Sequence, residues 1–268
     1  MSSVINNSSN RKLGLARVLS KLGYCSRSSA AELIRAGRVS LNGKLRRDPE
    51  TPVRGSQDQI TVDGNAIEWQ GQIYLMLNKP RGVVTTASDE KGRQTVYATL
   101  NEGRVAENFS RDQLPWVAPV GRLDKASEGL LLLTNDTDWG ARIAAPATHL
   151  DKTYHVQVDR VADEEFIQAL LRGVKVRGVK ARDGELLRAK QARRLRAGQK
   201  NCWIEIVLDE GRNRQIRRIM EALGVVVLRL VRVAIGPLPL GDLAKGKYRA
   251  LTVDEKRMLD LALRDKSS

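Results

Sequence analysis

The sequence is poor in the side chains that build disulfide and metal sites, with two cysteines and two histidines among 268 residues. The cysteines, Cys25 and Cys202, are too few for a disulfide scaffold and favour a reducing compartment, so we expect the protein in the cytoplasm. Two histidines would leave a zinc site to be completed by carboxylates, which makes metal catalysis a poor explanation of any activity. No run approaches the roughly 18 apolar residues of a membrane span, so no membrane partner is expected.

Positive charge is what the sequence has in excess: 46 Lys and Arg residues stand against 31 Asp and Glu, a net charge of +15. The excess is concentrated in residues 11–54, with eleven basic and three acidic residues, and in residues 171–200, with eleven and two. Basic helix faces are often merely solvated, but so few acidic partners favour surfaces that bind phosphate. A hydrophobic share of 41% is sufficient for a buried core, so the composition indicates a folded protein that binds a polyanion, usually nucleic acid.

Residues 1–10 are small and polar and are interpreted as a disordered lead-in, and residues 11–68 as a first domain. This domain begins with apolar residues at helical spacing up to Gly23, after which Ser26 can cap a second helix that ends at Gly37. Two short strands follow, and each runs into a hairpin turn, at Asn42-Gly43 and Asp63-Gly64. The first domain is therefore predicted to contain two short helices and a small sheet.

The remainder is predicted as a second domain, residues 72–255, followed by a C-terminal tail, residues 256–268. Apolar runs predict strands at 73–77, 202–208 and 225–233, and alternating residues predict another at 153–158. Periodic apolar stripes predict a helix at 163–171, capped by Asp163, and another at 212–223. Residues 87–115 are polar, with several Gly and Pro residues, and are expected to form a long exposed excursion. Strands and helices alternate irregularly, which favours an α+β fold with a mixed sheet over a strictly parallel one.

Asp124 is the first candidate for a catalytic side chain, because it lies on a Gly-rich turn between Arg122 and Lys125, just before a buried strand. A nearby cation keeps such a carboxylate ionised, as a carboxylate nucleophile requires. Taken alone, however, an Asp in a turn is more often an ordinary turn residue. Arg217 lies at the margin of an apolar helix stripe and needs an anionic partner, for which Asp124 and Glu221, one helical turn away, are equally good candidates.

The N-terminal residues resemble a known RNA-binding module. The segment Gly23-Tyr24-Cys25-Ser26-Arg27, residues 33–39 and Asn42-Gly43 are similar to the S4 domain, and the resemblance covers about residues 13–60. In that module the two helices present basic side chains to structured RNA. The resemblance therefore implies that three basic residues of this region contact RNA, namely Arg27, Arg35 and Arg38.

Four further segments resemble the bacterial rRNA pseudouridine synthases that carry an S4 domain. They occur in the family's order and centre on Asn78-Lys79-Pro80-Arg81-Gly82, Gly121-Arg122-Leu123-Asp124, Lys152-Thr153-Tyr154 and Asn213-Arg214-Gln215-Ile216-Arg217. The resemblance implies an α+β protein, a small α/β S4 domain followed by a mixed-sheet catalytic domain, that isomerises uridine to pseudouridine in ribosomal RNA without a cofactor. Large-subunit (23S) rRNA is favoured as the partner, and a monomer is expected.

The same resemblance implies roles for individual residues. Asp124 would be the nucleophile, attacking C1′ or C6 of the target nucleotide, and Arg217 would pair with it. Tyr154 would pack on the uracil, although without the resemblance it reads as a core tyrosine of a strand. Arg122 would fill the gap left by the flipped-out nucleotide. The remaining residues implied to contact substrate or RNA are Ile216, as a wall of the base pocket, with Arg212, Asn213 and Lys79.

Two alternatives stay open at the level of sequence. The protein could modify 16S rRNA or tRNA, since the S4 module and the basic stretches favour large structured rRNA without proving it. It could also be a non-catalytic S4-type assembly factor that binds rRNA, in which Asp124 has no chemical role. A carboxylate of Asp124 in a cleft beside a guanidinium supports the isomerase, whereas one in bulk solvent leaves only an RNA-binding protein.

Overall fold

The computed structural model describes residues 13–54, 57–68, 71–86, 89, 91–102, 114–176 and 184–264. The chain forms two compact units. The first unit comprises Met1–Tyr74, Glu107–Ala118 and Leu133–Thr137, and the second comprises Leu75–Ala106, Pro119–Leu132 and Asp138–Ser268. The lead-in expected at residues 1–10 lies outside the described residues.

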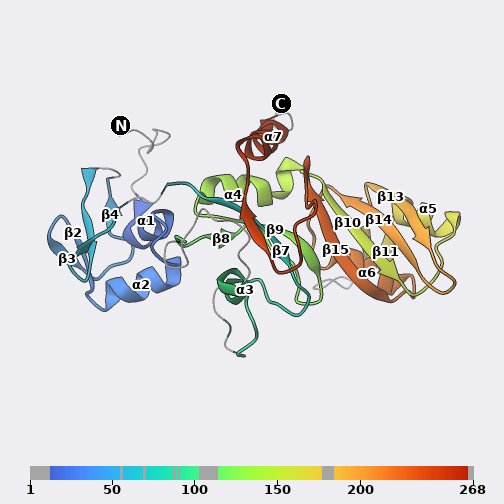
Figure 1. Ribbon diagram of the computed structural model, residues 1–268, viewed down its shortest axis with the longest axis horizontal. Helices are drawn as coiled ribbons and strands as arrows, with labels where there is room; N and C mark the ends of the chain where they lie inside the picture. Colours follow the sequence, from blue (N-terminus) through green and yellow to red (C-terminus); the bar gives the residue numbers. More distant parts are fainter. Residues whose placement is uncertain are drawn as a thin grey trace. The chain divides into compact units, whose positions relative to one another are not determined.

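Two short helices and a small antiparallel sheet make up most of the first unit (Figure 1). The helices are α1 (Leu15–Lys21) and α2 (Arg27–Arg35). The sheet has the order β3-β2-β5-β6, with strands β2 (Val39–Leu41), β3 (Lys44–Arg46), β5 (Ile60–Val62) and β6 (Asn65–Ala66). A separate pair joins β1 (Leu13–Gly14) to β4 (Pro52–Val53). The helices and the small sheet predicted for this region are confirmed.

Local sequence signals explain why these elements begin and end where they do. Ser26 caps α2, as predicted, because its side chain accepts a hydrogen bond from the backbone N–H of Ser29 at 3.1 Å. Gly23 and Gly37 follow the helix ends with φ of +79° and +74°, in the left-handed region that favours glycine. The apolar stripes pack into one core of Leu15, Ala16, Leu19, Ala30, Ile34, Val39, Leu41, Val53, Ile60 and Val62. Most of the basic side chains of this unit are thereby left exposed, among them Arg27, Arg35 and Arg38.

A nine-stranded mixed sheet is carried largely by the second unit, in the order β13-β14-β10-β15-β9-β7-β17, with β16 beside β15 and β8 beside β9. Its strands are β7 (Tyr74–Lys79), β8 (Ala118–Pro119), β9 (Glu128–Thr134), β10 (Lys152–Val158), β13 (Gln191–Ala197), β14 (Cys202–Leu208), β15 (Val227–Ile235), β16 (Leu238–Pro239) and β17 (Tyr248–Ala250). β10 pairs antiparallel with β14 and β15, whereas β15 and β9 are parallel. The predicted α+β class with a mixed sheet is confirmed.

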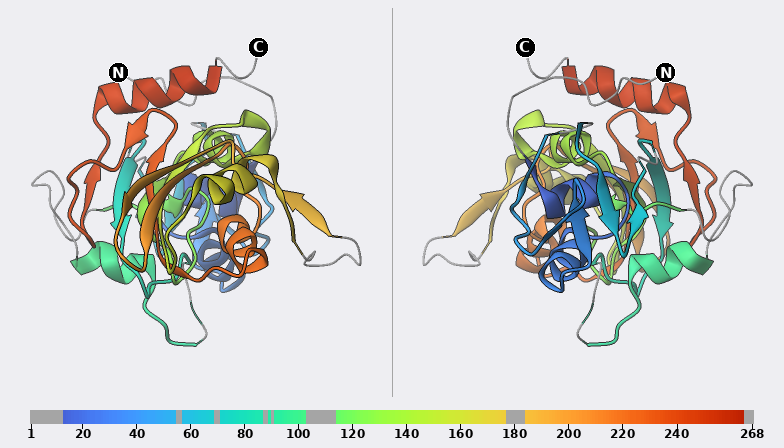
Figure 2. Two further views of the ribbon diagram at one scale, coloured as in Figure 1. Left: turned by 90° about the vertical axis from the view of Figure 1, so that its right-hand side faces the viewer. Right: turned by 90° about the vertical axis from the view of Figure 1, so that its left-hand side faces the viewer.

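Helices accompany this sheet. They are α3 (Val96–Glu102), α4 (Thr137–Ala144), a 3-10 turn (Pro146–Thr148), α5 (Glu164–Arg172), α6 (Gln215–Ala222) and α7 (Val253–Arg264). Trp139 of α4 donates from Nε1 to Asp260 of α7 at 2.9 Å, which holds these two helices side by side (Figure 2). A two-stranded pair, β11 (Val174–Val176) and β12 (Glu185–Leu187), extends away from the sheet in both views of Figure 2. Among the described residues, no helix has the length and apolar character needed to cross a membrane.

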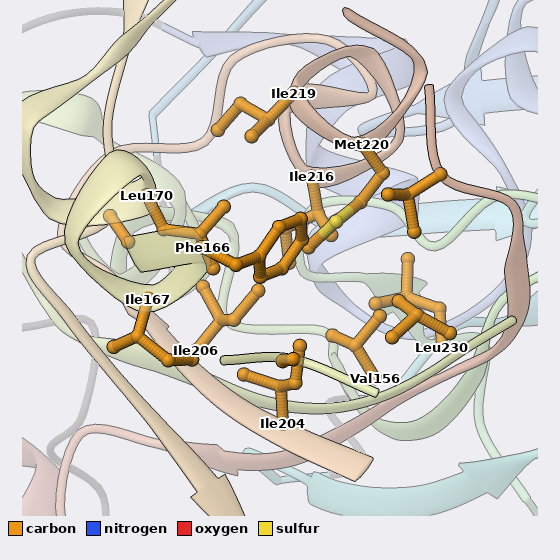
Figure 3. Packing of buried hydrophobic residues seen from close by; sticks show 14 of the residues in the cluster. Val156, Phe166, Ile167, Leu170, Ile204, Ile206, Ile216, Ile219, Met220 and Leu230 are labelled. Atoms are coloured by element: carbon orange, nitrogen blue, oxygen red, sulfur yellow. The ribbon is translucent and has the colours of Figure 1, made fainter. Parts of the chain in front are cut away.

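The main core of the second unit lies between the sheet and helices α5 and α6. Figure 3 shows Phe166 of α5 next to Met220 of α6, with strand side chains packed around them, among them Val156, Ile204, Ile206 and Leu230. Asp163 caps α5, as predicted, by accepting a hydrogen bond from the backbone N–H of Phe166 at 2.8 Å. This packing fixes α6 on the sheet and so determines where the residues at its start lie.

Two expectations about irregular segments are wrong in part. α3 lies within the excursion expected at 87–115 and buries Val96, Thr99 and Leu100, while residues 103–113 lie outside the described part. α7 continues the fold beyond residue 255, where the sequence predicts a tail, and buries Leu259 and Leu263. Each helix buries only two or three side chains, so the apolar pattern that would predict a helix is too weak to recognise among the polar residues.

Candidate active site

A cavity of about 190 Å³ in the second unit brings together most of the residues singled out in the sequence. Most of its lining comes from the turn before β9, the adjacent strands β10 and β15, and the start of α6, and the ends of α4 and β14 complete it. The predicted site residues in this lining are Arg122, Asp124, Tyr154, Arg212, Ile216 and Arg217. Asn213 is exposed on the segment before α6 and is not part of the lining.

Lys79, at the end of β7, supports the turn that carries Asp124. Its side chain is fully buried, and Nζ donates to the backbone oxygens of Pro80, Asp124 and Ser127 at 3.1, 3.2 and 2.8 Å. Burial lowers the pKa of Lys79 to about 8, while the carboxylates of Asp124 and Glu128 act in the opposite direction. The expectation that Lys79 contacts RNA is therefore wrong, because an enclosed ammonium with three backbone partners cannot reach a phosphate.

The carboxylate of Asp124 is only partly exposed, with 32% of its side chain accessible, and forms an ion pair with Arg214. The distance from Arg214 Nη1 to Asp124 Oδ2 is 3.5 Å. Arg214 has a φ of +48°, in the left-handed region, so α6 begins at Gln215 and not at Arg212 as the periodicity predicts. The guanidinium that faces Asp124 thus belongs to Arg214, just before the helix. Asp124 does lie in a cavity beside a guanidinium, but its partner is Arg214 and not Arg217.

Arg217 makes a different contact from either of those predicted. Its Nη2 donates to the backbone oxygen of Ala126 at 2.9 Å, and among the described residues it forms no ion pair with Asp124 or with Glu221. Its Nε is buried and has no hydrogen-bond partner there. Burial lowers the pKa of Arg217, nearby Arg214 lowers it further, and the charge of Asp124 raises it. Arg217 therefore holds the backbone of the turn and adds positive charge near Asp124, but it does not pair directly with the carboxylate.

Tyr154 and Arg232 lie opposite each other on β10 and β15, so their side chains share one face of the sheet, and both line the cavity. Arg232 is 6% exposed; its Nε donates to the backbone oxygen of Leu130 at 2.7 Å, whereas Nη2 is buried with no partner among the described residues. Arg232 was not among the residues that the sequence indicated as candidates. The available signal was parity along the strand, because Arg232 follows the buried Leu230 by two residues.

Backbone packing holds Arg232 in place. At Gly129 of β9, opposite Arg232 on the neighbouring parallel strand, φ is +100°. A Cβ built there would overlap the backbone oxygen of Arg232. Only glycine permits this approach, so β9 and β15 come together at the point where the cavity is lined.

The predicted contacts at the edge of the cavity differ in their surroundings. Ile216 is 4% exposed and forms part of the cavity wall, as predicted. Arg122 is exposed on its turn. Arg212 is engaged by two carboxylates, Glu185 at 2.7 Å from Nη1 and Glu210 at 2.8 Å from Nε. Contacts of Arg122 and Arg212 with RNA stay predictions.

The three basic residues predicted to bind RNA in the first unit are all exposed. Arg27 pairs with Glu50 at 3.0 Å, and Arg38 donates from Nε to Asp63 at 2.9 Å. That contact raises the pKa of Arg38 and lowers the pKa of Asp63. Arg35 has no carboxylate partner among the described residues. Phosphate contact by these side chains stays a prediction.

The cavity combines one carboxylate with several cations and apolar walls. The cations are Arg122, Lys152, Arg212, Arg214, Arg217 and Arg232, and the apolar walls include Leu208, Ile216 and Leu230. A carboxylate can attack an electrophilic carbon, cations stabilise developing negative charge, and apolar side chains suit the faces of a planar ring. No group of His, Cys, Asp or Glu side chains within the described ranges could hold a metal ion.

Comparisons with known proteins agree with this chemistry. The RNA pseudouridylate synthase family model matches residues 73–222, and the S4 domain model matches residues 13–64. The chain is 37% identical over 251 residues to ribosomal large subunit pseudouridine synthase B of Bacillus subtilis, covering 92% of this chain and 96% of that protein. It is 35% identical to a protein of the same name from Pseudomonas aeruginosa, covering 92% of this chain and 61% of that protein.

A solved structure gives the same result for the fold. The crystal structure of a pseudouridylate synthase superposes with a TM-score of 0.59 at 30% sequence identity, covering 92% of this chain and 99% of that one. The resemblance read from the sequence motifs is thus confirmed. Because the S4 domain is followed in the sequence by the matching catalytic domain, the chain belongs to the RNA pseudouridylate synthase family.

Proposed function

We propose that the protein isomerises a specific uridine to pseudouridine in the ribosomal RNA of the large subunit. The names of the relatives from Bacillus subtilis and Pseudomonas aeruginosa support this substrate, as does the net charge of +15. The placement of Asp124 is the observation that carries the reaction. Its carboxylate is partly exposed in a cavity, paired with Arg214, and Tyr154 lines the same space.

The reaction moves the attachment of uracil to the sugar from N1 to C5. The bond between C1′ and N1 breaks, a bond between C1′ and C5 forms, the hydrogen of C5 leaves as a proton and N1 gains a proton. No electron donor or acceptor is consumed. Asp124 is proposed as the nucleophile, with attack at C1′ or at C6. The surrounding cations stabilise negative charge that develops on the base.

Attack on either carbon requires the target nucleotide to leave its stack, since a stacked base exposes neither atom. The flipped base is proposed to enter the cavity between Tyr154 and Ile216. Arg122, exposed on the turn two residues before Asp124, is proposed to occupy the gap left in the RNA. The S4 domain, through Arg27, Arg35 and Arg38, and the segment with Arg212 and Asn213 would hold the surrounding structured RNA.

Release of tritium from rRNA labelled at C5 of uridine tests the reaction. The wild-type protein should release tritium, and Asp124→Asn should not. Mapping pseudouridines by carbodiimide treatment and primer extension, with and without the gene, identifies the substrate. Loss of one stop in large-subunit rRNA supports the proposal, whereas loss of a stop in 16S rRNA or tRNA contradicts the substrate. Unchanged modification in Asp124→Asn would leave a non-catalytic RNA-binding role.

A further inference from the structure

Three basic side chains reach inward around the turn that carries Asp124, and their hydrogen bonds are not equally complete. Lys79 places its ammonium on three backbone oxygens. Arg217 uses one nitrogen on the backbone, and its buried Nε has no partner in the described part of the chain. Arg232 uses Nε on the backbone, and its buried Nη2 likewise has no partner among the residues that the structure describes. A buried donor with no acceptor is costly, so Arg217 and Arg232 each have hydrogen-bonding capacity that the folded chain leaves unused.

Arg232 is the more deeply placed of the two arginines. It is 6% exposed, on a strand inside the sheet, and lines the cavity opposite Tyr154. A backbone phosphate remains at the surface of a folded RNA, because its charge is hydrated and the sugar chain continues on both sides. A flipped-out base, in contrast, enters a cavity edge first. The depth of Arg232 therefore selects for the base over the phosphate.

The cavity wall around Arg232 suits one edge of a pyrimidine. Leu230 and Ile235 lie on the same strand, and Ile216 faces them from α6, so these side chains offer apolar surface for the two ring faces. A guanidinium donates hydrogen bonds and accepts none. Of the polar groups on the edges of uracil, only the carbonyl oxygens at C2 and C4 are acceptors, since N3 carries a hydrogen.

We propose that Arg232 donates a hydrogen bond to a carbonyl oxygen of the target uracil and so belongs to the group that recognises the base. The inference rests on the proposed function, because it assigns a substrate contact within the same cavity. It adds a contact that the sequence motifs do not include, since Arg232 lies outside all four segments of the family resemblance. Gly129 fixes the backbone of Arg232, so the donor is preorganised.

Single-turnover kinetics on an rRNA fragment spanning the mapped uridine provide the first test. Arg232→Met should lower the rate at saturating RNA by about 10- to 100-fold, the size expected for a lost hydrogen bond from a charged donor. The Kd for the whole fragment should change less than about twofold, because phosphate contacts dominate RNA affinity. Arg257→Met on α7, also an exchange of one arginine, should change neither quantity, since Arg257 is exposed and outside the cavity.

Sulfur substitution in the substrate separates a direct contact from a structural role. Fragments carrying 2-thiouridine or 4-thiouridine at the target position replace one carbonyl with a poorer acceptor. The wild-type protein should lose about 10-fold in rate on one of the two, and Arg232→Met should show no further loss at that position. Lys79→Met serves as the matched control, because it removes a buried cation that contacts only backbone. It should be slower on every substrate and keep the full sulfur penalty.

The outcomes are distinct. A wild-type protein that forms no pseudouridine in rRNA contradicts the proposed function itself. An active wild-type protein with the same two sulfur penalties as Arg232→Met contradicts only the contact assigned to Arg232. If Arg232→Met fails to fold, judged by circular dichroism, Arg232→Lys keeps the charge with a shorter reach and is taken through the same cycle. Loss of the penalty at one carbonyl in either variant supports the inference and identifies the atom.

Discussion

The positive charge of the S4 domain and that of the catalytic cavity differ in what surrounds each guanidinium. In the S4 domain, Arg27 and Arg38 are exposed and pair with carboxylates that are themselves exposed. In the cavity, Arg217 is half-buried and Arg232 is buried; each binds a backbone oxygen and keeps a buried N–H that has no partner among the described residues. The same residue type is thus used in two physical regimes within one chain.

This difference indicates two separate tasks. Exposed charges act over about 8–10 Å at physiological salt and are screened beyond it, so they attract any phosphate backbone and carry little positional information. Buried donors are screened far less, and their direction is fixed by the strands and turns that hold them. We therefore expect the S4 arginines to govern RNA affinity and the cavity arginines to govern the rate of the reaction.

The largest effect is expected at Asp124, whose carboxylate lies among the cations of the cavity. Asp124→Asn removes the proposed nucleophile while keeping the shape of the side chain, so pseudouridine formation should fall by at least about 1,000-fold. Binding of rRNA should remain, since the S4 domain is untouched. Tritium release and a filter-binding Kd measure the two quantities. Loss of binding in parallel with activity would contradict the division of tasks.

The next largest effects are expected when one arginine of the cavity and one of the S4 domain are each replaced. Arg217→Met should lower the turnover rate by about 10- to 100-fold with little change in Kd, because it frees the turn at Ala126 and removes a half-buried charge from the cavity. Arg27→Met should raise Kd a few-fold and leave the turnover rate unchanged. Steady-state kinetics on the same rRNA fragment compare them. Both variants changing the same parameter would break the comparison.

The buried ammonium of Lys79 gives the cavity a pH dependence that the S4 surface lacks. Because its pKa is lowered to about 8, raising the pH through 8 removes a charge and one donor from beneath Asp124. The turnover rate should therefore fall above pH 8. Lys79→Met should be slower by about 10-fold at neutral pH and lack this fall. A fall that persists unchanged in Lys79→Met would assign it to another group.

Stability should respond to the same titration with the opposite sign. An ordinary lysine, as in the unfolded chain, has a pKa of 10.5, against about 8 for Lys79 in the folded chain. Between these values the unfolded chain binds more protons, so the free energy of unfolding contributed by Lys79 rises with pH. The cost of burying the charge is fully present below pH 8 and is relieved between pH 8 and 10.5. Denaturant unfolding of wild-type protein, measured as the difference from Lys79→Met, isolates this contribution.

The smallest effects separate paired from unpaired arginines within the S4 domain. Arg35→Ala removes a side chain with no carboxylate partner among the described residues, so the slope of log Kd against log salt should fall by up to about 0.9. Arg38→Ala should reduce the slope less, because Arg38 is shared with Asp63. Arg257→Ala on α7 is the control for net charge. Equal slopes for Arg35→Ala and Arg38→Ala would show that the ion pair opens on binding.

Local signals let the sequence predict the elements that depend on neighbouring residues. Ser26 and Asp163 cap their helices as predicted, since a cap involves only the next three residues. The strand at 202–208 has the predicted bounds because all of its residues except Glu205 are apolar. Tyr154 and Ile216, which also line the cavity, were identified only through the family resemblance, since their spacing in the chain carries no information on distance; Arg214 and Arg232 were not identified.

Side-chain partners could not be predicted in the same way. The sequence assigned Arg217 to Asp124, whereas the left-handed conformation of Arg214 shifts the start of α6 and brings Arg214 to the carboxylate instead. The family resemblance implied that Lys79 contacts RNA, whereas the assembled sheet encloses its side chain. Both errors concern which of several cations comes nearest, a question that tertiary packing answers.

The glycine at position 129 has a consequence for how far this site can be altered. Asp124 stands five residues before it along the chain, and Arg232 sits directly across from it on the neighbouring strand. The separation of the proposed nucleophile and the proposed base contact is therefore set by the backbone, because Gly129 has no Cβ to keep the two strands apart. A residue with a side chain at position 129 would push β9 and β15 apart. The carboxylate of Asp124 and the guanidinium of Arg232 would then be displaced together, so the site tolerates no substitution at this glycine.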